Sequence, residues 1–148
     1  MTKPDFASAA ARHLRDAEHL ASEGPHRSPD QAWHLVGYVL ECSRKACVAS
    51  GWIPKLLGHD FTDGSEVVVE VAIALDPRAS RMPVRGWNAR YPEVGAWRPD
   101  HRYDRTGTLE ATPARDLTSL LGVARAAVDD VTVALLLEGE VAMELLAR

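Results

Sequence analysis

Residues 29–49 read PDQAWHLVGYVLECSRKACVA, a stretch in which apolar side chains recur every three or four positions. That spacing places them on one face of an α-helix. Gly51 follows and is a typical helix stop. We therefore predict one helix over these residues, and we expect Gly37 and Ser43 to let a neighbouring segment approach it closely.

The sequence on either side of this stretch also has helical spacing. Apolar residues recur with that period from Phe6 to Ala21, and again from Thr112 to about Ala147. Gly122 and Gly139 are the two positions at which the last helix could bend or divide. These three segments indicate an all-α fold.

Residues 66–75 are compatible with either a helix or a strand. The run from Val67 to Leu75 is rich in β-branched residues and almost continuously apolar, which suits a buried strand as well as a buried helix. Asp63 followed by Glu66 imitates a capping box, and the sequence offers no second strand for pairing. We therefore expect a helix.

Residues 76–108 contain four prolines, which no continuous helix can accommodate. This segment nevertheless holds four of the nine aromatic residues and seven of the 17 basic residues. We expect an irregular loop that is ordered, because loops with such anchors are usually functional or wrapped over the core. The predicted architecture is a single domain, residues 1–148, in which four to five helices form a bundle and this Arg- and aromatic-rich loop precedes the last long helix.

Composition and charge exclude several classes of protein. The chain has 148 residues, is 46% hydrophobic and carries a formal net charge of -4, which argues against a surface that is basic throughout but allows a local basic patch. No apolar run approaches the roughly 18 residues of a membrane span, so we expect no membrane association and a cytoplasmic location. Neither a metal-ligand spacing nor a phosphate-binding or dinucleotide motif occurs, and we expect no cofactor and no metal. Cys42 and Cys47 are interpreted as reduced, buried thiols.

Four polar residues align along the predicted helix of residues 29–49. His34, Tyr38, Glu41 and Lys45 follow one another at helical spacing beside the apolar face. One interpretation is a ligand-binding cleft lining, in which His34 or Glu41 carries a proton and Lys45 or Arg44 meets a phosphate. The other is a modest ion pair between Glu41 and Lys45 on a solvated face.

Two further segments have both a functional and a structural interpretation. Residues 97–105 interleave cations and aromatic rings, as required for stacking on bases while neutralising phosphates, although Asp100 and Asp104 weaken that case. A loop pinned by buried Trp and by ion pairs has the same composition. His59-Asp60 could form an acid-base pair, but a turn in which Asp60 or Asp63 caps the next helix is the simpler interpretation.

Three motifs together resemble the HEPN-domain family. They are residues 16–20, residues 31–46 with Glu41-x-x-x-Lys45-Ala46, and the tetrapeptide Gly58-His59-Asp60-Phe61. A later Trp and Arg-Tyr element, residues 97–103, looks like one seen in some members. The clear resemblance covers about residues 10 to 61.

This resemblance implies a bundle of four or five helices, commonly homodimeric, in bacterial toxin-antitoxin, antiphage or RNA-processing systems. Many members are metal-independent ribonucleases that use an Arg followed after four to six residues by a His, near the last long helix. Here no histidine occurs after His101, so the chain departs from the family at the residues of its active site.

We therefore expect a binding or assembly protein whose ligand is RNA, a nucleotide or a partner protein. The expected ligand-binding residues are His34, Tyr38, Glu41, Lys45 and Tyr103. An alternative is a divergent ribonuclease in which His101 acts with Arg98 and Arg102. A third is a structural dimer or antitoxin-type partner, which would carry an exposed apolar strip on the C-terminal helix.

Overall fold

In the computed structural model of the chain, the described residues are 4–48, 51–112 and 116–139, and all of their secondary structure is helical. The α-helices are α1 (Phe6–Ala21), α2 (Pro29–Ala46), α3 (Ile53–Leu57), α4 (Gly64–Leu75), α5 (Trp87–Arg90) and α6 (Leu117–Leu137). The 3-10 helices are η1 (Pro77–Arg81), η2 (Pro92–Val94) and η3 (Pro99–Tyr103). The all-α prediction is confirmed. We expected four to five helices, and the described residues contain six α-helices. Two of these six, α3 and α5, are short.

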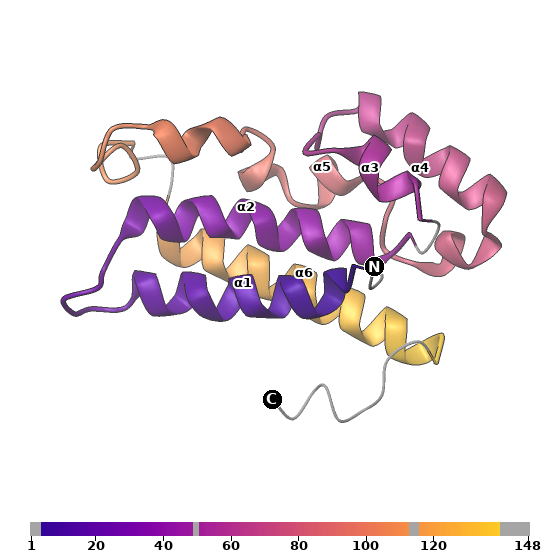
Figure 1. The fold of residues 1–148 in the computed structure, drawn as a ribbon, viewed down its shortest axis with the longest axis horizontal. Helices are drawn as coiled ribbons and strands as arrows, with labels where there is room; N and C mark the ends of the chain where they lie inside the picture. The colour runs from indigo at the N-terminus through magenta and orange to yellow at the C-terminus, as the bar shows by residue number, and fades with distance from the viewer. Residues whose placement is uncertain (1–3, 49–50, 113–115, 140–148) are drawn as a thin grey trace.

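The three long helices α1, α2 and α6 pack against one another pairwise (Figure 1). Asp5 begins α1 by accepting a hydrogen bond from the Ser8 N–H at 3.0 Å, and Asp116 begins α6 in the same way with Ser119 at 2.8 Å. Many of the buried residues on α1 and α6 are alanines, whose small side chains let helix axes approach closely. The bounds predicted for the first helix are confirmed.

The other two long helices are shorter than predicted. Helix α2 ends at Ala46, and Ala49 lies outside the described residues. Helix α6 runs without a break from Leu117 to Leu137, so Gly122 does not divide it, and Gly139 follows its end with a φ of 72°. The predicted extensions of this helix over residues 113–115 and 140–147 lie outside the described residues.

Residues 64–75 form the helix α4, as expected, but most of its apolar side chains are not buried. Only Ser65, Val69 and Ala72 are buried, because a single face of α4 meets the rest of the molecule. Asp63 precedes the helix without making a side-chain cap, so the capping-box interpretation was wrong. Glu66 turns instead towards Arg44 on α2.

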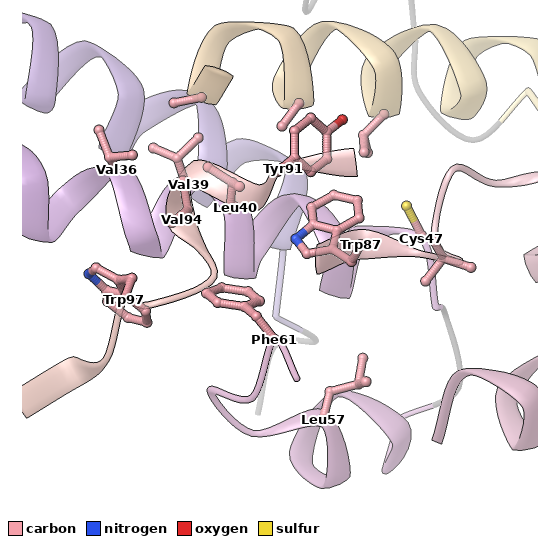
Figure 2. Packing of buried hydrophobic residues seen from close by; sticks show 14 of the residues in the cluster. Val36, Val39, Leu40, Cys47, Leu57, Phe61, Trp87, Tyr91, Val94 and Trp97 are labelled. Atoms are coloured by element: carbon pink, nitrogen blue, oxygen red, sulfur yellow. The ribbon is translucent and has the colours of Figure 1, made fainter. Parts of the chain in front are cut away.

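We expected an irregular loop over residues 76–108. Instead, these residues form successive short helices. Pro77, Pro92 and Pro99 exclude a long helix, yet each begins a short one, because proline is favoured at the first helical position. In and between these short helices, four large side chains are buried in the core that surrounds α2 (Figure 2). They are Trp87, Tyr91, Val94 and Trp97. The segment is therefore ordered, as predicted.

Candidate functional site

Trp97 fixes the second half of residues 76–108 on α2. Its ring lies directly on Gly37, where a Cβ would stand 1.9 Å from the nearest ring atom. The rings of His34 and Tyr38 flank it, with centroids 5.8 and 5.1 Å from that of Trp97. The close approach predicted at Gly37 is confirmed, and Trp97 is the neighbour that makes it. This contact places η3 beside the first half of α2.

His101 on η3 is held by two acceptors. Its Nδ1 lies 2.8 Å from Asp104 Oδ2, and its Nε2 lies 3.1 Å from the carbonyl oxygen of Ala96. The side chain is also mostly buried, with 20% of its surface exposed. His101 therefore braces the turn between residues 96 and 104.

Arg98, Arg102, Tyr103 and Arg105, which we call the arginine segment, are exposed. None of its three arginines makes an ion pair with any described residue. The Arg102 guanidinium lies 4.7 Å from the centroid of the Tyr103 ring, and Tyr103 is 74% exposed. Arg105 is absent from the site residues that we expected from the sequence. Neither its exposure nor the absence of an ion pair with described residues can be recognised from the sequence.

Asp30, in the first turn of α2, holds the far end of the arginine segment. Its two carboxylate oxygens accept hydrogen bonds from the backbone N–H groups of Gly107, at 2.6 Å, and Leu109, at 2.8 Å. Trp97 and Asp30 thus fix the chain on both sides of Arg98–Arg105. Exposed side chains on a fixed backbone lose little backbone entropy when they bind a ligand.

The other four arginines of residues 76–108 all reach an acidic side chain. Arg78 pairs with Asp76, Arg81 with Glu138, Arg85 with Glu70 and Arg90 with Asp130, at nitrogen-oxygen distances of 2.7, 2.6, 2.7 and 3.8 Å. All four arginines of this first half therefore take part in ion pairs. The structural interpretation of residues 97–105 holds in part, because the buried Trp97 pins that loop, whereas its arginines make no ion pair with described residues.

The polar stripe on α2 does not lie on a solvated face. His34 and Glu41 are each only 7% exposed, and Trp97 covers the stripe beside His34 and Tyr38. The predicted ion pair is present, with Lys45 Nζ donating to Glu41 Oε1 at 2.6 Å, but both side chains are largely buried. The stripe therefore splits into an aromatic half under Trp97 and a charged half around Glu41.

His59 joins the charged half of the stripe and does not merely fill a turn. Its Nδ1 lies 2.5 Å from Glu41 Oε2, so Glu41 contacts two basic side chains. The neighbouring Asp60 faces elsewhere and accepts a hydrogen bond from the Thr62 N–H, which lowers the pKa of Asp60 together with the nearby Arg44 and Arg98. The cavity between Glu41 and Asp60 measures about 10 Å³, room for about one water molecule and no larger ligand.

Arg44, which we considered as a phosphate ligand, is a structural residue. It is 2% exposed, and its guanidinium donates to Glu66 Oε1 and Ser65 Oγ at 2.6 Å each and to the Asp60 carbonyl at 3.2 Å. Glu66 in turn accepts hydrogen bonds from the backbone N–H groups of Gly86 and Trp87. One buried cation therefore joins α2, α4 and the start of α5.

Burial favours the neutral form of two histidines, His13 and His34. Burial lowers the pKa of His13 and of His34 below the ordinary value of 6.5. The positive charges of Arg102 and His101 lower the pKa of His34 further. His34 therefore couples electrostatically to the arginine segment, although Trp97 lies over it.

Cys42 and Cys47 are free and buried, as predicted. Burial raises the pKa of Cys42 to about 11 and that of Cys47 to about 12, so both thiols are protonated and unreactive at neutral pH. Among the described residues no group of three or more His, Cys, Asp and Glu side chains is placed to hold a metal ion. None of the described helices combines the length and the apolar character needed to cross a membrane.

Comparison with models of protein families, with curated proteins and with solved structures finds no match to this chain. The HEPN resemblance therefore stays a prediction. What the chain binds has to be inferred from the geometry of its own residues.

Proposed function

We propose that this chain binds single-stranded RNA through the arginine segment. The observation that carries the proposal is that Arg98, Arg102 and Arg105 are exposed and make no ion pair with described residues, whereas the four arginines before them all do. Arginines without internal partners are available to phosphate groups, with which the guanidinium forms paired hydrogen bonds.

Tyr103 supplies the second element of the site. Its ring is 74% exposed and already carries the Arg102 guanidinium at 4.7 Å. An exposed ring of this kind can stack on an unpaired base, while a neighbouring arginine contacts the adjacent phosphate. Bases inside a duplex are not open to such stacking, which favours a single strand.

The local charge also supports an anionic ligand. Asp104, which weakened the case in the sequence, is engaged by His101 and does not neutralise an arginine. Asp100 and Asp60, which lies near Arg98, then remain as the acidic side chains beside the three arginines. The resemblance to a family with many RNA-directed members selects RNA over DNA in this proposal.

The ribonuclease alternative gains no support from the geometry. A general acid or base needs a ring nitrogen that is open to the substrate, and both nitrogens of His101 face internal acceptors. We therefore propose binding without assigning a reaction.

Fluorescence anisotropy with a labelled single-stranded RNA over a series of NaCl concentrations tests the proposal. The variant R98A/R102A/R105A should lose most of its affinity, and its salt dependence should fall by about 2 in slope, since each phosphate contact on a single strand contributes about 0.7. Tyr103→Ala should weaken binding about 5- to 100-fold at all salt concentrations.

The matched control is R78A/R81A/R85A, which removes the same charge from the first half of the loop. It should bind with nearly wild-type affinity. Equal losses in the two triple variants would show that binding follows net charge alone and would refute the site. No binding of RNA by the wild-type chain would refute the function.

A further inference from the structure

One face of α4 is apolar and uncovered. Val67, Val71 and Leu75 follow one another at every fourth residue and are 68%, 41% and 57% exposed. Helix α3, which packs against α4, adds Trp52 at its N-cap and Leu56, at 49% and 59% exposed. These five are most of the exposed large hydrophobic side chains in the described residues. By contrast, the strip on the C-terminal helix that the structural-dimer alternative requires is limited, among the described residues, to Val133 and Leu137.

Both charged residues of α4 are paired with arginines. Glu70, which lies on α4 next to Val71, accepts two hydrogen bonds from Arg85, of 2.7 and 3.0 Å. The other charged residue of α4, Glu66, turns inward to Arg44. Helix α4 can therefore meet a second copy of itself without the repulsion that unpaired like charges would cause.

We propose that this face of α3 and α4 binds a second copy of the chain. Side chains four residues apart form a ridge, and two such ridges interdigitate when the helices cross at about -50°. A twofold axis near Val71 would bring α4 against its own copy, as in most homodimers.

The available area suits this occupant. Five side chains of this size that are about half exposed offer on the order of 500 Å² of apolar surface, at the upper end of what a monomer leaves uncovered. Since little more than half of an interface is apolar, this corresponds to roughly 900 Å² on each copy. A standard interface buries about 800 Å² on each partner.

The proposed interface is separate from the arginine segment. Helices α3 and α4 lie towards one end of the long axis of the molecule and η3 towards the other (Figure 1). Both surfaces can therefore be occupied at once. This inference does not depend on RNA binding.

Analytical ultracentrifugation of the full chain at about 1 to 100 µM tests it. We expect a concentration-dependent species of twice the mass of the chain. Val71→Glu should raise the dimer dissociation constant at least tenfold, because it places two like charges at the twofold axis. Circular dichroism should show an unchanged helical fold, since Val71 is exposed, and RNA affinity per site should not change.

Val133→Glu, which charges an exposed valine on α6, is the matched control and should leave the dimer intact. A wild-type chain that stays monomeric at about 100 µM overturns the proposal and leaves a different protein as the occupant. A dimer that V71E does not weaken overturns it as well. If V71E unfolds, Val71→Cys decides: mild oxidation should link two copies through this residue, whereas V133C should not be linked.

Discussion

Arg78, Arg81, Arg85 and Arg90 each contact an acidic side chain, whereas Arg98, Arg102 and Arg105, in the same proline- and aromatic-rich segment, contact none among the described residues. The partners of the first group include Glu70 on α4 and Glu138 at the end of α6. The second group lies on η3 and beyond it, next to the first half of α2. Similar composition thus gives ion-paired arginines in one half and, in the other, arginines without an ion pair to described residues, and the position of distant acids decides which.

The two halves also differ in what anchors them. The first half is tied to Arg44 by hydrogen bonds from Gly86 and Trp87 to Glu66. The second half is held by Trp97 on Gly37 and by Asp30. Its arginines are therefore not needed for attachment. They are exposed and make no ion pair with described residues, as the proposed RNA binding requires.

The largest effect should come from removing the anchor of the second half. Trp97→Ala empties a fully buried site and should lower the free energy of unfolding by about 3 to 5 kcal/mol. Chemical denaturation measures this loss. Trypsin should also cleave after Arg102 and Arg105 much faster than in wild type. Val133→Ala, at an exposed site outside both proposed surfaces, is the control, and a similar loss there would contradict the anchoring role of Trp97.

Breaking the anchor of the first half should have a somewhat smaller effect. Arg44→Ala leaves Glu66 without its cation and should cost about 3 kcal/mol, the low end for a buried pair, because Glu66 is partly exposed. Urea denaturation measures this cost. RNA affinity at a temperature where the variant is folded should be unchanged. A loss of RNA binding in the folded variant would show that the two halves are not independent.

A pH titration should distinguish the halves without removing an anchor. Because burial lowers the pKa of His13 and His34 in the folded state, the unfolded chain binds more protons just below pH 6.5. Stability should therefore be full above this pH and should decline as the pH falls through 6.5 towards the folded-state values. Urea midpoints across this range measure the decline.

Two variants assign the pH effect to residues. His34→Gln should flatten the decline, and Arg102→Ala should flatten it in part, because the charge of Arg102 helps to lower the pKa of His34. Arg85→Ala, in the first half, should leave the slope as it is. An unchanged slope in H34Q would rule out His34 as a source.

The smallest effect should come from the exposed ion pairs themselves. Arg85→Ala should shift the urea midpoint slightly at low ionic strength and not measurably in 0.5 M NaCl, because surface pairs are weak and screened by salt (~0.5 M reduces the Debye length to a few ångströms). Its RNA affinity should match that of wild type. A shift that persists in high salt would indicate a packing role for the Arg85 stem.

Periodicity predicted the long helices well, because a regular spacing of apolar residues is a local property. Helix α1 has the predicted bounds, and α2 and α6 have the predicted centres. Gly37 was identified as a point of close approach, since a helical glycine beside an apolar face has few other uses. The pair of Glu41 and Lys45 was predicted because its partners lie one turn apart.

The interactions that could not be predicted join residues far apart in the sequence. Nothing in the sequence connects Arg44 with Glu66, His59 with Glu41 or Asp30 with Gly107, because each pair depends on how the helices pack. For the same reason, seven arginines of similar context could not be divided into paired and unpaired ones. His101 is a similar case, since its two internal acceptors appear only once η3 is in place.

The contact of Trp97 with Gly37 constrains how this sequence can change over generations. A Cβ at residue 37 would lie 1.9 Å from the ring, so a larger residue there is acceptable only where residue 97 gives up volume. The two positions should therefore covary, and a paired library should recover a large residue at 37 only together with a small one at 97. Arg102 makes no ion pair with a described residue, so under the proposed RNA binding it is selection for the ligand that would keep it.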